Sequence, residues 1–161
     1  MENSIAELLK FSDKILELNN SINDNRINSF ENEFKITLPD DFKNFISKIN
    51  GFSLMGNKVY GFNKNIPESI ENVYRFEHFD VLYPQYEKLV PFCNDGRGNF
   101  YCLDTSKNNK KDNCPIVFWV SNYEYSLEDL PEIVYNSFIE WLNEVIIEWT
   151  LESYDYDGNE K

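Results

Sequence analysis

Histidine is almost absent from this sequence of 161 residues, in which His78 is the single example. Serine and cysteine hydrolases usually need a histidine as general base, and no recognisable nucleophile motif accompanies His78. A packed or surface histidine is therefore a better interpretation than a catalytic one. The three cysteines are odd in number and lack the close spacing of metal ligands: Cys93, Cys102 and Cys114. They predict reduced thiols, no zinc site and no cofactor.

Basic residues and long apolar runs are also scarce. The chain has 15 lysines and arginines against 28 aspartates and glutamates, a net charge of −13. Such a charge repels nucleic acid and anionic membranes and attracts a basic protein surface, although many proteins are acidic for solubility alone. No apolar run approaches the roughly 20 residues that span a membrane, and no signal segment follows Met1. We expect a cytoplasmic protein with a protein partner, and neither nucleic acid nor membrane as ligand.

Apolar residues are nevertheless plentiful enough for a sizeable core, since hydrophobic residues make up 42% of the chain and aromatic residues 16%. A first helix is predicted at 4–19, where Ser4 and Glu7 have the spacing of a capping box. Gly56-Asn57 predicts a hairpin turn. Strands are predicted at 88–93, 100–104 and 115–120, with one more possible between 122 and 132. Helices first, strands in the middle and a helix last predict a single α+β domain with a mostly antiparallel sheet.

The last predicted helix carries an apolar and an acidic stripe. The apolar stripe is expected in the core and consists of Val134, Phe138, Trp141, Leu142, Val145, Ile146 and Trp149. Glu140, Glu144 and Glu148 recur every four residues, and like charges at this spacing destabilise a helix by a few tenths of a kcal/mol per pair. Local stability therefore does not explain the acidic stripe. It is either drift in an acidic protein or a surface that faces a basic partner.

Residues 27–52 are the most informative stretch and predict two short amphipathic helices. Pro39 suits the first position of the second helix, and Asp40 and Asp41 follow at the positive end of its dipole. The apolar stripe of that helix comprises Phe42, Phe45, Ile46 and Ile49. Asn50-Gly51 then ends the helix, because Gly and Asn adopt a left-handed closing conformation at least cost.

This stretch resembles the signature of the SUKH superfamily, the Smi/Knr-like proteins. The matching residues are Phe30-Glu31, Leu38-Pro39-Asp40-Asp41-Phe42 and Asn50-Gly51, followed in order by Val90-Pro91-Phe92, residues 94–99, residues 101–104 and residues 137–142. The resemblance implies a curved sheet with N-terminal helices and a long C-terminal helix packed against it. We expect this one domain to span residues 1–151. The polar, acidic segment 152–161 is expected to be a frayed tail.

The glycine-rich segment Asp95-Gly96-Arg97-Gly98-Asn99 is a further candidate site. It is superficially similar to a calcium loop, but Arg97 occupies a ligand position and Ser106 stands where the loop needs glutamate. A phosphate cradle is disfavoured because no Lys-Ser/Thr pair follows. A hairpin connection is the simplest role. In the superfamily the corresponding loop lies beside the face that is implied to meet partners, which implies protein-binding roles for Asp95, Arg97 and Asp104.

A second acidic cluster, Glu124, Glu128 and Asp129, lies near Tyr123 and Tyr125 in a predicted loop. The sequence leaves a glycosidase pair of carboxylates open, because the two groups need only be close in space. Acidic residues are so frequent, however, that chance supplies many such pairs.

Bacterial members of the superfamily are mostly implied to be immunity proteins that neutralise polymorphic toxins, and fungal members are implied to regulate cell-wall synthesis. The leading hypothesis is therefore a non-enzymatic bacterial immunity protein. It would bind a basic toxin domain, for example a nuclease, through an acidic surface with aromatic residues. The alternatives are a regulatory adaptor that binds a cellular protein and, as a third class, a small hydrolase.

Overall fold

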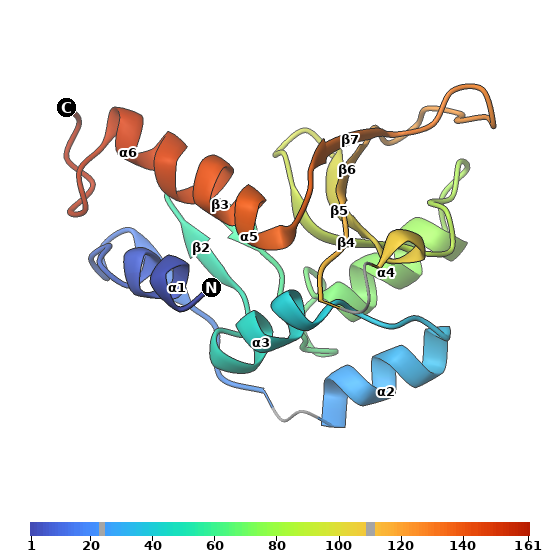
Figure 1. The fold of residues 1–161 in the computed structure, drawn as a ribbon, viewed down its shortest axis with the longest axis horizontal. Coiled ribbons are helices and arrows are strands. Elements are labelled where there is room, and N and C mark those ends of the chain that lie inside the picture. The colour runs from blue at the N-terminus through green and yellow to red at the C-terminus, as the bar shows by residue number, and fades with distance from the viewer. Residues whose placement is uncertain (23–24, 109–111) are drawn as a thin grey trace.

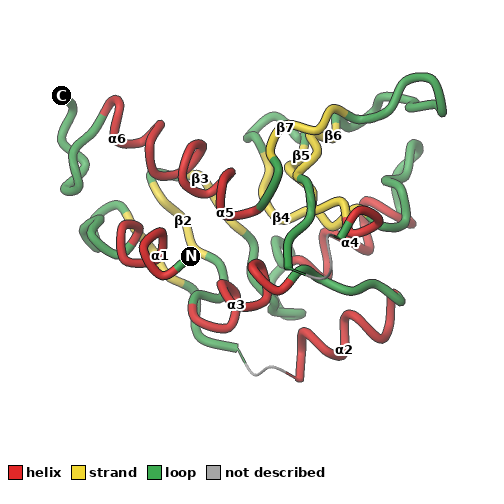
Figure 2. Tube along the Cα trace, in the orientation of Figure 1, coloured by secondary structure: helices red, strands yellow, loops and turns green. Residues whose placement is uncertain are grey.

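A seven-stranded antiparallel sheet organises the structure, a computed structural model that describes residues 1–22, 25–108 and 112–161. The strands follow one another across the sheet in sequence order (Figures 1 and 2): β1 (Leu16–Leu18), β2 (Phe52–Leu54), β3 (Asn57–Val59), β4 (Leu89–Asn94), β5 (Phe100–Asp104), β6 (Ile116–Trp119) and β7 (Glu132–Tyr135). The α+β class and the antiparallel sheet predicted from the sequence are confirmed.

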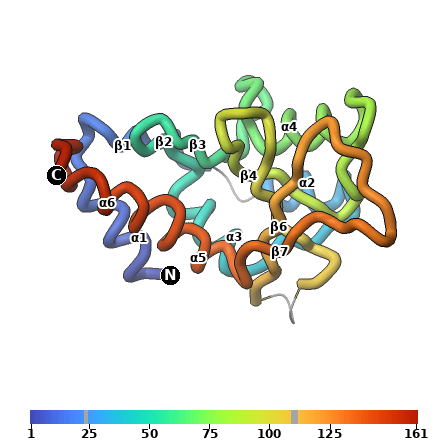
Figure 3. Tube along the Cα trace, turned by 90° about the horizontal axis from the view of Figure 1, so that it is seen from above, coloured from blue at the N-terminus to red at the C-terminus, as the bar shows by residue number. Residues whose placement is uncertain are grey.

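The helices lie on both sides of this sheet. They are α1 (Glu2–Leu8), α2 (Asn25–Phe34), α3 (Asp40–Lys48), α4 (Ile70–Phe79), a 3-10 turn (Thr105–Lys107) and a C-terminal helix composed of α5 (Phe138–Trp141), a π-helical segment (Leu142–Glu148) and α6 (Trp149–Ser153). Figures 1 and 3 show α1 beside the C-terminal helix, with α4 near β4 and away from both. The long C-terminal helix expected from the sequence is thus present.

Aromatic contacts hold the helices on one face of β4. The Phe92 ring lies 6.0 Å from Phe42 of α3, 5.4 Å from Phe138 and 4.7 Å from Trp141 of the C-terminal helix, measured between ring centroids. The opposite face is covered by α4 and the segment after it, where Tyr86 meets Trp119 of β6 with ring centroids 5.4 Å apart. Strands β4 to β6 are therefore largely buried on both faces, which explains their continuous apolar sequences.

The signature residues build the junction between α3 and the first hairpin. Pro39 is the N-cap of α3, one position before the predicted one. The buried Asn50 side chain donates to the carbonyls of Asn20 and Phe62, both at 3.1 Å, and accepts from the Phe62 N–H at 2.7 Å. Gly51 has a φ of 77°, and a Cβ there would lie 2.5 Å from the backbone nitrogen of Gly61. The Asn-Gly pair is thus required by hydrogen bonding and by close backbone contact.

The first predicted helix is wrong beyond Leu8. Helix α1 ends there, and residues 16–18 form β1, which pairs with β2 from Leu16 opposite Leu54 onward. The apolar residues Ile15 and Leu16 are compatible with a helix or a strand. A strand forms here because its backbone pairs with the open edge of β2. Met1, rather than Ser4, is the N-cap, so the expected capping box is absent.

The apolar stripe of the C-terminal helix is correct from Phe138 to Ile146. Val134, which was expected at its start, lies instead in strand β7 and is only partly buried. After Ile146 the helix departs from the prediction again. A π-helical turn contains more residues than an α-helical turn, so the segment Leu142–Glu148 rotates the following positions. Thr150 is buried in place of Trp149, whose side chain is 54% exposed. The helix therefore presents a tryptophan to solvent.

The tail after residue 153 is packed against α1 rather than frayed. Tyr154 forms a β-bridge with Glu160. The Tyr156 ring lies 5.1 Å from the Phe11 ring, its hydroxyl donates to Glu7, and its carbonyl accepts from the Ser12 N–H at 2.8 Å. The expectation from acidic composition fails because one aromatic residue and the turn around it provide the contacts.

Candidate protein-binding surface

Two neighbouring loops at one end of the sheet carry the most exposed large apolar side chains. One is the segment 80–88 after α4, and the other is the β6–β7 loop, residues 120–131. Figures 1 and 3 show both at the end farthest from the C-terminus. Leu127 is 95% exposed and Leu82 is 80% exposed, and Phe79 and Leu130 are each more than half exposed. We call these two loops together with Phe79 the end surface.

A chain of aromatic rings joins the two loops. Tyr86 contacts Trp119, the Trp119 ring lies 4.5 Å from Tyr125, and the Tyr125 ring lies 4.8 Å from Tyr123. The Tyr125 hydroxyl also accepts from the Val120 N–H at 3.0 Å. These contacts place the β6–β7 loop on a fixed platform. Beneath it lies a hollow of about 320 Å³ whose lining includes Tyr86 and Leu130.

The charge of the end surface is negative. Glu124, Glu128 and Asp129 are exposed, and neither Glu124 nor Glu128 forms an ion pair with any described residue. The Tyr123 hydroxyl donates to Asp129, and this hydrogen bond raises the pKa of Tyr123. The lysines that line the hollow do not offset this charge, because both form ion pairs elsewhere. Lys88 pairs with Glu87 at 3.0 Å, and Lys107 pairs with Asp104, also at 3.0 Å.

Asp104 borders this hollow but is buried and has a structural role. Its carboxylate accepts from the N–H of Ser106 at 3.2 Å and from the Ser106 hydroxyl, in addition to the ion pair with Lys107. These bonds close the 3-10 turn after β5. Asp104 therefore shapes the base of the end surface without offering a free carboxylate.

Asp95 and Arg97 lie at the other end of the β4–β5 hairpin, away from Asp104. The Asp95 carboxylate accepts from the N–H groups of Arg97 at 2.8 Å and Asn99 at 3.0 Å, and from the Asn99 side chain at 2.8 Å. Partial burial raises the pKa of Asp95, but the Asn99 and Arg97 hydrogen bonds lower it below its ordinary value overall. The segment is the hairpin connection that its glycines predict, and Arg97 is exposed at its tip.

The acidic stripe lies at a third place, along the C-terminal helix. Glu140 accepts from the Asn136 N–H at 2.6 Å, while Ser137 accepts from the Glu140 N–H at 3.1 Å. This arrangement is close to a capping box, and the Ser137-x-x-Glu140 spacing was the available sequence signal. Glu144 and Glu148 are exposed and form no ion pair within the described ranges. The candidate residues thus form three separate groups rather than one site.

The structure adds apolar residues that acidic patterning could not reveal. Leu82, Leu127 and Leu130 interrupt polar loops without helical or strand periodicity, and this is the only sequence signal they give. An exposed apolar patch with a polar rim is typical of protein-binding sites. The end surface has both features, and it contains the predicted Glu124, Glu128 and Asp129.

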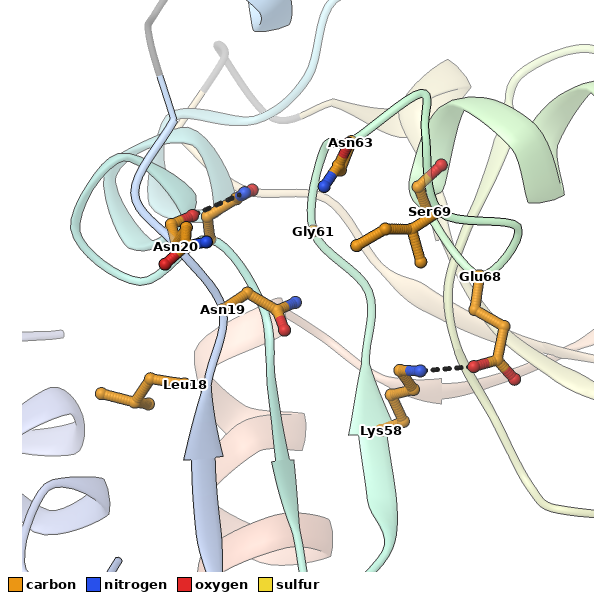
Figure 4. A pocket seen from close by; sticks show the side chains of 10 residues that line it. Leu18, Asn19, Asn20, Lys58, Gly61, Asn63, Glu68 and Ser69 are labelled. Atoms are coloured by element: carbon orange, nitrogen blue, oxygen red, sulfur yellow. Dashed lines mark hydrogen bonds and ion pairs between the residues drawn. The ribbon is translucent and has the colours of Figure 1, made fainter.

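A separate polar hollow of about 220 Å³ lies beside the signature junction (Figure 4). Its charged groups pair with each other, since Lys58 donates to Glu68. The Asn50 side chain also lines the hollow, and its amide group is hydrogen-bonded to the backbone of Asn20 and Phe62. The dashed lines in Figure 4 mark two of these internal contacts. The hollow is therefore a structural feature of the signature, with few free polar groups.

Metal and nucleophile chemistry finds little support in the described ranges. They contain no group of three or more His, Cys, Asp and Glu residues arranged to hold a metal. The His78 ring stacks on Tyr74 at 3.7 Å, and its nitrogens lie 2.8 and 3.1 Å from the carbonyl oxygens of Tyr74 and Tyr86. These contacts make His78 a packed residue, and burial lowers its pKa. No described helix is long and apolar enough to cross a membrane.

Comparisons with known proteins agree with this architecture. A crystal structure of a protein from Pseudomonas syringae pv. tomato is similar, with a TM-score of 0.67 and 17% sequence identity over 92% of this chain and 99% of that chain. At this identity the similarity concerns the fold. No curated protein matches the sequence. Residues 1–148 match the SUKH family described as SMI1-KNR4 cell-wall. The chain therefore belongs to the SMI1-KNR4 family of the SUKH superfamily.

Proposed function

We propose that this protein is a non-enzymatic immunity protein, which binds a cognate toxin domain and blocks it through the end surface. The observation that carries the proposal is the exposed apolar group of Phe79, Leu82, Leu127 and Leu130 on an ordered aromatic platform. Large apolar side chains at the centre of a surface dominate the energy of protein–protein binding, while the polar rim adds specificity. The family is compatible with this role.

The charge of the chain indicates a basic partner. The net charge is −13. Glu124, Glu128 and Asp129 line the rim of the apolar group, and no described lysine or arginine forms an ion pair with them. Complementary charge accelerates the encounter between two proteins and disfavours wrong partners. A nuclease toxin fits this chemistry because its nucleic-acid groove is basic, and an acidic inhibitor can occupy such a groove.

The same surface would also suit a regulatory adaptor, and the cell-wall description of the family keeps that second function open. A hydrolase receives less support. It would need two carboxylates that converge in a hollow, whereas the hollow beneath the end surface contains one buried carboxylate, Asp104, which is already paired.

Co-expression with the toxin encoded by the neighbouring gene tests the proposal. We expect the wild-type protein to restore growth and to form a stable complex with the purified toxin domain. Leu127→Asp combined with Leu130→Asp should abolish both effects without a change in melting temperature, because both side chains are exposed. Leu9→Asp is the matched control, since Leu9 is half exposed beside α1, away from the two loops.

Two results would contradict the proposal in different ways. Full protection by the Leu127/Leu130 double variant would move the binding site elsewhere on the protein. A wild-type protein that neither protects cells nor binds the toxin would overturn the immunity function and favour the regulatory adaptor.

A further inference from the structure

A groove of about 600 Å³ lies along α4, beside the first residue of β5 and the residue that follows β3. Its walls are largely apolar, and its lining includes Tyr60, Val73, Phe76, Glu77, Asp80 and Phe100. Phe76 is about half exposed, so the groove is open to solvent along α4. Phe76 and Phe79 are three residues apart on the helix, and the groove therefore adjoins the end surface.

Glu77 is an unpaired carboxyl group at the base of this groove. The residue is only 5% exposed, and its side chain forms no hydrogen bond or ion pair with the described residues. Burial alone raises the pKa of Glu77. A buried carboxylate without a partner is costly, and natural proteins usually supply a counter-charge.

Two other buried carboxylates of this protein do have such a partner. Glu71 lies 3.7 Å from Arg26, and Asp104 lies 3.0 Å from Lys107. The uncharged titratable groups that interact with Glu77 are Tyr60, which lines the groove, and the Cys102 thiol, which is fully buried in the sheet. Burial raises the pKa of both, so both are uncharged near neutral pH. Glu77 thus lacks the counter-charge that the other two possess.

Basic side chains near the groove are directed elsewhere. Arg75 pairs with Glu33, and its guanidinium carbon lies 5.0 Å from the centre of the Phe34 ring. Lys58 pairs with Glu68 at the far rim. Asp80, exposed at the near rim, forms no ion pair within the described ranges. The groove therefore combines apolar aromatic walls with a carboxyl group, that of Glu77, which pairs with no basic side chain of the described residues.

We propose that this groove receives an arginine side chain of the protein partner, with its guanidinium group against Glu77 and its methylene stem along Phe76 and Phe100. Arginine fits better than lysine because its planar head is weakly hydrated, stacks on aromatic rings and binds a carboxylate through two hydrogen bonds. This inference rests on the proposed function only in assuming that the protein binds another protein.

A titration with a small probe tests the groove without the toxin. The probe is N-acetyl-arginine N-methylamide, added to the isotopically labelled protein and followed by NMR. Saturable shifts are expected at Tyr60, Val73 and Phe76. The corresponding citrulline compound has the same shape without the charge, and it should produce no such shifts. Equal shifts with citrulline would overturn the proposal.

The variant Glu77→Gln should weaken binding of the arginine probe by about tenfold or more, because the charge-assisted hydrogen bonds are lost. Glu152→Gln is the matched control, because it makes the same change at an exposed position of α6, away from α4. Its effect on binding of the probe should be less than about threefold. In the wild type, the carbon-13 signal of the Glu77 carboxyl group should show a lower pKa when the probe is bound. Unchanged affinity of Glu77→Gln, or an unchanged Glu77 pKa, would overturn the inference.

The two proposals can fail independently. If the probe does not bind but the Leu127/Leu130 variant loses toxin protection, the groove is wrong and the function stands. If the probe binds at Glu77 but no toxin is neutralised, the groove stands as an arginine site on a protein with another partner.

Discussion

Asp41 illustrates how a signature residue can be unfavourable to stability. One of its carboxylate oxygens accepts from the Phe42 N–H at 2.7 Å, and the other is buried without a partner. Burial raises the pKa of Asp41 to about 6, and the neighbouring charge of Asp40 acts in the same direction. The folded protein therefore binds a proton at Asp41 more tightly than the unfolded chain, whose aspartates titrate near 3.9. Between these two values the contribution of Asp41 to stability is lost as the pH rises.

We predict that Asp41→Asn stabilises the protein at pH 7, by an amount on the order of 1–3 kcal/mol. Asparagine keeps an acceptor for the Phe42 N–H and removes the buried charge. Below about pH 4 the aspartate is protonated in both states, so the difference between variant and wild type should disappear. Urea denaturation at pH 4, 5.5 and 7 measures this. Asp13→Asn, at an exposed position between α1 and β1, is the control and should change little. A destabilised Asp41→Asn at pH 7 would show that the charge is needed.

Single residues were predictable where local geometry sets their role. Asn50 and Gly51 were assigned to a helix end from their backbone preferences alone, and both lie at that junction. Asp95 and Asp104 were grouped because the superfamily resemblance implies that both lie beside the face that meets partners. Strand β5 separates them, however, and an antiparallel strand advances about 3.4 Å per residue. The bonds that occupy both carboxylates are local, since their partners lie two to four residues further along the chain. These structural roles were therefore within reach of the sequence, as the hairpin connection at Asp95 shows.

At the scale of elements, the C-terminal helix shows where periodicity stops being informative. Its buried residues follow the α-helical pattern through Trp141, Leu142, Val145 and Ile146. Nothing in the sequence announces the π-helical segment, and the error appears only after it, at Trp149. The predictions for residues 16–18 and for the tail were wrong for a related reason. Both segments are fixed by tertiary contacts, with β2 and with α1, and these partners are distant in sequence.

The two tryptophans of this helix give a matched pair of predictions. Trp141→Ala should cost roughly 3–5 kcal/mol, because the fully buried ring contacts Phe92 and Tyr101 and would leave a cavity. Trp149→Ala should change stability by no more than about 0.5 kcal/mol, since its ring is largely in solvent. Chemical denaturation of both variants measures this. Similar costs for the two would contradict the helix phase described here.

The glutamates of the same helix should also differ in effect. Glu140→Ala should cost roughly 0.5–1.5 kcal/mol, because the Asn136 N–H loses its acceptor at the helix start. Glu144→Gln with Glu148→Gln should leave stability unchanged or raise it by a few tenths of a kcal/mol, because like charges near the negative end of the dipole are removed. Thermal melts at low salt distinguish them. A stabilising Glu140→Ala would show that the cap contributes nothing.

At the scale of the whole molecule, the acidic character was readable from composition, but its distribution was not. Glu124, Glu128 and Asp129 lie in a loop, as predicted, and the structure adds the apolar residues beside them. Those side chains come from two loops that are about 40 residues apart in sequence, and the contact between Tyr86 and Trp119 joins them. A binding surface of this kind needs the fold before it can be recognised.

The net charge also leads to a prediction about nucleic acid. Binding to DNA or RNA gains most of its energy from lysine and arginine contacts to phosphates. This chain has 15 basic residues against 28 acidic ones, and its one short basic stretch is 107–111, of which 109–111 lie outside the described residues. We expect no binding in a mobility-shift assay at near-physiological salt, with a basic protein of similar size as the positive control. Tight binding that weakens steeply as salt rises would contradict the proposed surface charge and favour a nucleic-acid role over toxin neutralisation.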